Sequence, residues 1–65
     1  MFVEFKSADD LDAKVAVNTA AVADIQESAD GTTKISYIGG GACWVAAKYD
    51  KVLKKIGGIT SAKEV

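Results

Sequence analysis

The chain has 65 residues, of which 49% are hydrophobic, and a formal net charge of −1. Its single cysteine and its lack of histidine exclude an internal disulfide and the usual zinc ligand set. No apolar run is long enough to span a bilayer, and no secretory leader is visible, so we expect a cytoplasmic protein that does not contact a membrane. Its length predicts a single domain over residues 1–58, followed by a loosely held tail over residues 59–65.

The N-terminal part predicts two short strands. Polar and apolar residues alternate over Met1–Lys6, as they do in a strand with one buried face. A polar loop follows, and residues 14–17 form the second strand. Asn18 and Thr19 interrupt this pattern, because their side chains can bond to nearby backbone groups.

A third strand is predicted over residues 23–28, after a tight turn. Val22 and Ile25 depart from strict alternation, which indicates a bulge near the start of this strand. The dipeptide Asp30-Gly31 then predicts a hairpin turn, because glycine readily supplies the positive φ that such turns need.

The fourth and fifth strands are predicted over residues 33–38 and 42–47, joined by Gly39-Gly40-Gly41. A phosphate-binding loop would need a Gly-Lys-Ser/Thr ending and a following helix. Here a strand pattern that contains Trp44 follows instead, so we interpret the glycines as a flexible hairpin connection.

The last element is a helix from about Lys48 to Ile56. Four apolar residues recur at the spacing of one helical face, and four lysines lie outside that face. Gly57-Gly58 ends the helix. The apolar residues are Tyr49, Val52, Leu53 and Ile56, and the lysines are Lys48, Lys51, Lys54 and Lys55.

These elements predict a mainly β fold. We expect a strongly bent, five-stranded antiparallel sheet or a small open barrel, similar in size to Sm and SH3 domains, with the C-terminal helix packed on one end. Many of the hydrophobic residues are alanines, which bury little area, so we also expect the chain to gain stability as a homo-oligomer.

No set of residues predicts catalysis. Asp9, Asp10 and Asp12 form an acidic cluster but lack the glycine and the distant glutamate of a calcium loop. Cys43 has no histidine to activate it and is interpreted as a small buried hydrophobic residue. We therefore expect no enzyme activity, no metal and no cofactor.

Two classes of binding protein remain. One is an accessory or regulatory module that binds itself or another protein through open sheet edges and the apolar helix face. The alternative is an RNA-binding or single-stranded-DNA-binding protein that uses the four helix lysines, with Trp44 or Tyr37 as a stacking platform. The charge distribution allows this, since residues 1–33 hold seven acids and two lysines while residues 34–65 hold six lysines and two acids. The absence of arginine favours the first class.

A pattern that covers about residues 14–56 resembles the small FlbD-type proteins of flagellar operons. It combines a strand that ends at Asn, an apolar pair, an Asp-Gly hairpin and a last strand that leads into a short helix. It is also similar to short bacteriophage proteins, those of marine cyanophages included, and more weakly to LytTR-type DNA-binding domains and Sm-like barrels. The resemblance implies a small accessory protein, phage-encoded in the second case, that acts by binding. It rests on Val15–Asn18, Val22–Ile25, Asp30–Thr32, Ile35–Tyr37, Trp44–Val45 and Tyr49–Ile56.

Overall fold

The computed structural model describes residues 1–57, apart from the side chain of Asp30. The tail predicted over residues 59–65 lies outside the described residues. The chain begins with an antiparallel hairpin of β1 (Phe2–Lys6) and β2 (Lys14–Asn18). As the alternation predicts, Phe5 is buried while its neighbours Glu4 and Lys6 are exposed.

A short 3₁₀ turn, η1 (Thr19–Ala21), leads from β2 into β3 (Val22–Glu27). The Asn18 side chain accepts a hydrogen bond from the backbone N–H of Ala20, which is the local bonding that the sequence predicted at this position. The pairing of β3 with its neighbour shifts register between Val22 and Asp24, so the predicted irregularity is confirmed.

A second 3₁₀ turn, η2 (Ala29–Gly31), joins β3 to β4 (Thr33–Tyr37), and Gly31 adopts the expected positive φ of 72°. The glycines at 39–41 lead into β5 (Ala42–Val45) with φ values of 91°, 113° and 89°. Residues other than glycine rarely adopt such φ values, which explains why three glycines follow one another here.

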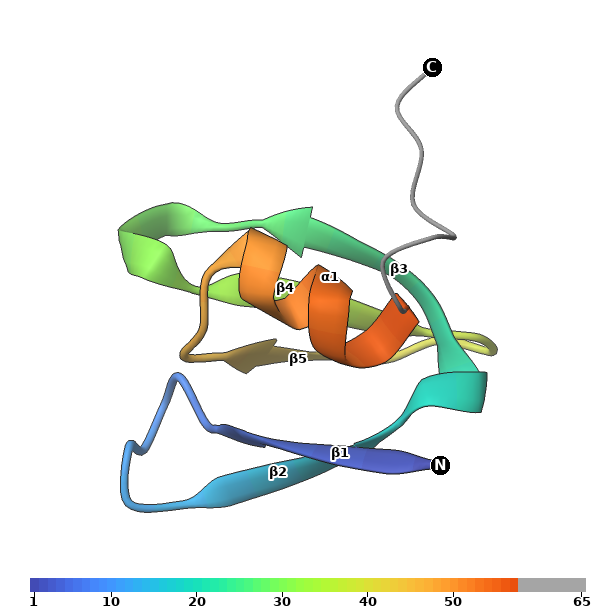
Figure 1. Cartoon of the computed structure of the whole chain (residues 1–65), viewed down its shortest axis with the longest axis horizontal. Coiled ribbons are helices and arrows are strands. Elements are labelled where there is room, and N and C mark those ends of the chain that lie inside the picture. The colour runs from blue at the N-terminus through green and yellow to red at the C-terminus, as the bar shows by residue number, and fades with distance from the viewer. Residues whose placement is uncertain (58–65) are drawn as a thin grey trace.

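The mainly β architecture is confirmed, but the expected single five-stranded sheet is wrong. The strands form a two-stranded sheet (β1-β2) and a three-stranded sheet (β3-β4-β5), and they do not close into a barrel (Figure 1). The two sheets meet at one corner, through an isolated bridge between Ser7 and Val45. There the N–H of Ala46 donates to the carbonyl of Lys6 at 2.8 Å. The ladder does not continue past this corner: apart from the bridge at Val45, Phe2–Lys6 pairs with β2 and Ala42–Val45 pairs with β4.

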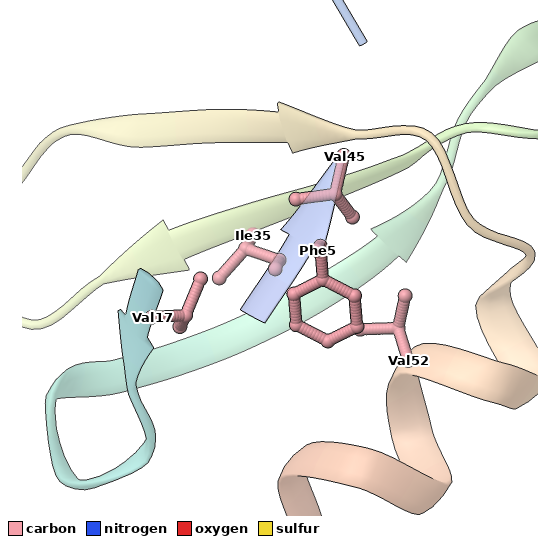
Figure 2. Packing of buried hydrophobic residues seen from close by; sticks show 5 residues of the cluster. All are labelled: Phe5, Val17, Ile35, Val45 and Val52. Carbon is pink, nitrogen blue, oxygen red and sulfur yellow. The ribbon is translucent and has the colours of Figure 1, made fainter. Parts of the chain in front are cut away.

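The C-terminal helix α1 (Tyr49–Gly57) completes the core, one residue later than predicted at each end. Five fully or almost fully buried side chains from β1, β2, β4, β5 and α1 pack together, as Figure 2 shows: Phe5, Val17, Ile35, Val45 and Val52. Of the predicted helix face, Val52 is buried while the other three residues are half-buried.

One polar side chain, Thr33, is also fully buried. Its hydroxyl donates a hydrogen bond of 2.8 Å to the carbonyl oxygen of Ala47, so this hydroxyl is satisfied inside the protein. The bond fixes the segment that connects β5 to α1, and it thereby helps to set where the helix begins.

Candidate functional site

An open depression of about 810 Å³ lies between the β1–β2 hairpin and α1. Its lining combines small or apolar residues with six lysines and two acidic residues. We call it the lysine groove. It is lined by Glu4, Phe5, Lys6, Lys14, Gly31, Ala46, Ala47, Lys48, Asp50, Lys51, Lys54 and Lys55.

The helix supplies three of these lysines, and Lys48 directly precedes it. Because Val52 is buried in the core, the orientation of α1 is fixed about its own axis. Residues 48, 51 and 55 are spaced three and four apart, so they lie along one side of the helix. Lys54 lines the same groove, and all four lysines are exposed. The structure thus brings together the four lysines that the sequence singled out.

The hairpin supplies two more lysines that the sequence analysis did not assign to a site. Lys6 ends β1 and Lys14 begins β2, and the two residues are direct partners in the antiparallel register. Their proximity follows from that register. A correct pairing of the first two predicted strands would therefore have revealed it.

Lys55 differs from the other groove lysines because it is bound within the protein. Its ammonium group donates a hydrogen bond of 3.2 Å to the carbonyl oxygen of Glu4. The same group lies 5.2 Å from the centre of the Phe5 ring, within the range of a cation–π interaction. Lys55 thus connects α1 directly to β1 across the groove.

The groove has an excess of positive charge. Six lysines line it, against the two carboxylates of Glu4 and Asp50. Among the side chains that the structure describes, no ion pair joins a groove lysine to a carboxylate. Apart from that of Lys55, which bonds to the Glu4 carbonyl, these ammonium groups remain available to an external anion, and the summed field of all six lysines attracts one.

Trp44 and Tyr37 lie away from this groove. Trp44 is 44% exposed, and it pairs with Lys34, whose ammonium lies 5.6 Å from the centre of the indole. Residues 34 and 44 alternate with the buried Ile35 and Val45, so they are on the outer face of the three-stranded sheet.

Tyr37 lies on the inner face of the same sheet, where it packs against the core. Its hydroxyl oxygen is 3.0 Å from the sulfur of Cys43, which is half-buried. This hydrogen bond, together with burial, raises the pKa of Tyr37 to about 12. The two aromatic residues proposed as a stacking platform are therefore on opposite faces of one sheet.

The described residues contain no group of three or more histidine, cysteine or acidic side chains that could hold a metal ion. Within residues 1–57, no helix has the length and apolar character that crossing a membrane requires. Comparisons with models of protein families, with curated proteins and with solved structures found no match to this chain.

Proposed function

We propose that this chain is a non-catalytic binding module whose lysine groove binds the phosphate backbone of a nucleic acid. One observation supports this most strongly: six lysines line one groove, two from the β1–β2 hairpin and four from α1 and the residue before it, and none of them is ion-paired within the described residues. A solvated helix face would explain Lys48 and the three lysines of α1. It does not explain why Lys6 and Lys14 of the hairpin lie at the same depression.

The arrangement suits a chain of anions better than a single small anion. Lys48 directly precedes α1, and from there to Lys55 the chain advances about 10 Å along the helix axis, at 1.5 Å per residue. A small anion would contact one or two of these lysines at a time, whereas a nucleic acid carries one charge per nucleotide and contacts several. Each phosphate that is neutralised releases counterions, which is the main source of non-specific affinity for nucleic acids.

The composition of the groove also predicts the mode of recognition. Lysine binds phosphate as a point charge, whereas sequence reading in the duplex grooves relies on side chains such as arginine, asparagine and glutamine. The groove lining contains none of these three residue types. We therefore expect affinity that depends strongly on salt and weakly on base sequence.

The test compares two variants with the same change in charge. Lys51→Glu reverses a charge in the groove, and Lys34→Glu does so on the outer face of the sheet. Binding of labelled single-stranded RNA and DNA is followed by fluorescence anisotropy over a series of salt concentrations. If roughly four phosphates are contacted, the wild-type affinity falls about fifty-fold for a fourfold rise in salt.

We expect Lys51→Glu to weaken binding by tenfold or more and Lys34→Glu to change it by less than about threefold. Lys14→Glu, on the other wall of the groove, is expected to behave like Lys51→Glu. An absence of binding at low salt would refute the proposal, and so would an equal loss of affinity in all three variants.

A further inference from the structure

Three large apolar side chains are exposed at the end of the molecule opposite the β1–β2 loop. Met1, Phe2 and Ile38 are 84%, 66% and 68% exposed. The 3₁₀ turn η1 holds them near one another, because Thr19 donates its N–H to the carbonyl of Met1, and Ala21 accepts from the N–H of Ile38. In Figure 1 the N-terminus, η1 and the β4–β5 turn share the right-hand end of the view.

Among the residues that the structure describes, this end has no charged side chain, and its one charged group is the N-terminal ammonium of Met1. Residues 1–3, 15–23 and 35–43, which build it, contain no aspartate, glutamate or lysine. The other end is highly charged, since the β1–β2 loop holds Asp9, Asp10 and Asp12. We call the first region the uncharged end. Depletion of charge and enrichment of aromatic residues and methionine are typical of the central part of a protein interface.

The glycines of the β4–β5 turn add a second property to this region. A Cβ atom placed at Gly39, Gly40 or Gly41 would meet no atom within 4 Å, so this turn is open to solvent. Beside Ile38 the surface therefore consists of bare backbone. Backbone without side chains allows another chain to approach closely.

The exposed area fits an interface of ordinary size. If a fully exposed residue of this kind presents about 200 Å², the three side chains together expose on the order of 400 Å² of apolar surface. That is about half of the ~800 Å² which each partner contributes to a typical stable interface. Apolar atoms make up a little over half of the area of such interfaces. The three side chains would therefore supply most of the apolar area that one partner contributes.

We infer that two copies of this chain pair through their uncharged ends. The described residues of this end have no charged side chain, and their one formal charge is the Met1 ammonium. Such a surface offers little complementarity to a strongly acidic or basic partner, whereas its apolar side chains can pack against their own copies in a two-fold symmetric contact. The small core of the monomer also favours pairing with a second copy, since only five hydrophobic side chains are buried among the described residues. Burial of Phe2 and Ile38 against a second copy would add to that small core.

This pairing is independent of the proposed ligand. The residues that line the lysine groove come from residues 4–6, 14, 31 and 46–55, and none of them belongs to the uncharged end. A dimer formed in this way therefore leaves both of its grooves accessible.

The experiment is sedimentation equilibrium of the full chain from low micromolar to near-millimolar concentration. The variants are Ile38→Asp and Phe2→Asp. The matched control is Leu11→Asp, because Leu11 is also 61% exposed but lies in the charged loop at the opposite end. Circular dichroism is used to check that each variant is folded. We expect all three variants to fold, because the replaced side chains are mainly exposed.

We expect the wild type and Leu11→Asp to be dimers in the upper part of this range, and Ile38→Asp and Phe2→Asp to need at least a tenfold higher concentration to associate. A wild type that stays monomeric throughout would overturn the inference, and so would a dimer that Ile38→Asp and Phe2→Asp leave intact. Weakening by Leu11→Asp alone would assign the interface to the other end and would also overturn it.

Discussion

The hydroxyl oxygen of Tyr37 lies 3.0 Å from the sulfur of Cys43 on the inner face of the three-stranded sheet, and this contact changes the pKa of Tyr37. The hydrogen bond favours the neutral phenol, as does its partial burial, and together they raise the Tyr37 pKa from 10.0 to about 12. The folded state thus holds this proton more tightly than the unfolded chain does. Its contribution to stability is complete below pH 10 and is lost as the pH rises through about 12.

This shift can be measured from the ultraviolet absorbance of tyrosinate in a Tyr49→Phe variant, in which Tyr37 is the remaining tyrosine. We expect a midpoint near pH 12 in the folded protein and near 10 in denaturant. Adding Cys43→Ala removes the main cause and should move the midpoint towards 10. An unchanged midpoint in that double variant would show that the thiol is not responsible.

At the scale of elements, the position of α1 relative to β1 depends partly on Lys55. Lys55→Met keeps the aliphatic stem and the helix propensity but removes the ammonium group, and with it the contacts to the Glu4 carbonyl and the Phe5 ring. We expect a loss of about 0.5–1 kcal/mol in the free energy of unfolding, measured by urea denaturation.

The matched control is Lys54→Met, one residue earlier on the same helix, because the Lys54 ammonium is exposed and has no bond within the described residues. Its effect on stability should be close to zero. In nucleic-acid binding the order of the two effects should be reversed. Lys54→Met should lower the salt dependence of the affinity, and Lys55→Met should change that salt dependence less. Equal loss of stability in both variants would contradict a special role for Lys55.

The elements themselves could be predicted from the sequence because their signals are local. The alternation in Met1–Lys6, the bonding of Asn18, the glycines at 39–41 and the apolar spacing around Val52 each involve residues within one turn or strand, and the structure confirms them. The separation into two sheets could not be predicted in this way. It depends on where Ser7 meets Val45, which are distant in sequence.

The same distinction applies to the site. Lys48, Lys51, Lys54 and Lys55 were identified because their spacing is visible in the eight-residue segment 48–55. Lys6 and Lys14 were missed because they become part of the groove only when the hairpin register and the docking of α1 are both known. The burial of Thr33 could not be predicted from the sequence either, since its hydrogen-bond partner Ala47 is fourteen residues away.

For the whole molecule, the two proposals together predict bivalent binding. A dimer with two accessible grooves holds a long strand at two points, and the second contact forms at a high effective concentration. We expect the wild type to bind a long oligonucleotide at least tenfold more tightly than the monomeric Ile38→Asp variant does. Both proteins should bind a short oligonucleotide that fills one groove with the same affinity per site.

This comparison is made by anisotropy titration above the dimer dissociation constant, with Leu11→Asp as the dimeric control. If Ile38→Asp loses affinity for the short oligonucleotide as well, the uncharged end itself contacts the ligand, and the two surfaces are not separate. If the long oligonucleotide shows no advantage in the wild type, the grooves do not act on one strand.

The single corner at Ser7 and Val45 has a mechanical consequence. A continuous ladder resists relative rotation of its strands with a row of hydrogen bonds, whereas a corner joint resists it mainly through the packing of side chains around Phe5 and Val52. A small rotation about this corner would change the distance between the hairpin and α1 while both ladders stay intact. The contacts of Lys55 with the Glu4 carbonyl and the Phe5 ring span the same gap, so the strength of these two contacts would limit how far the groove widens.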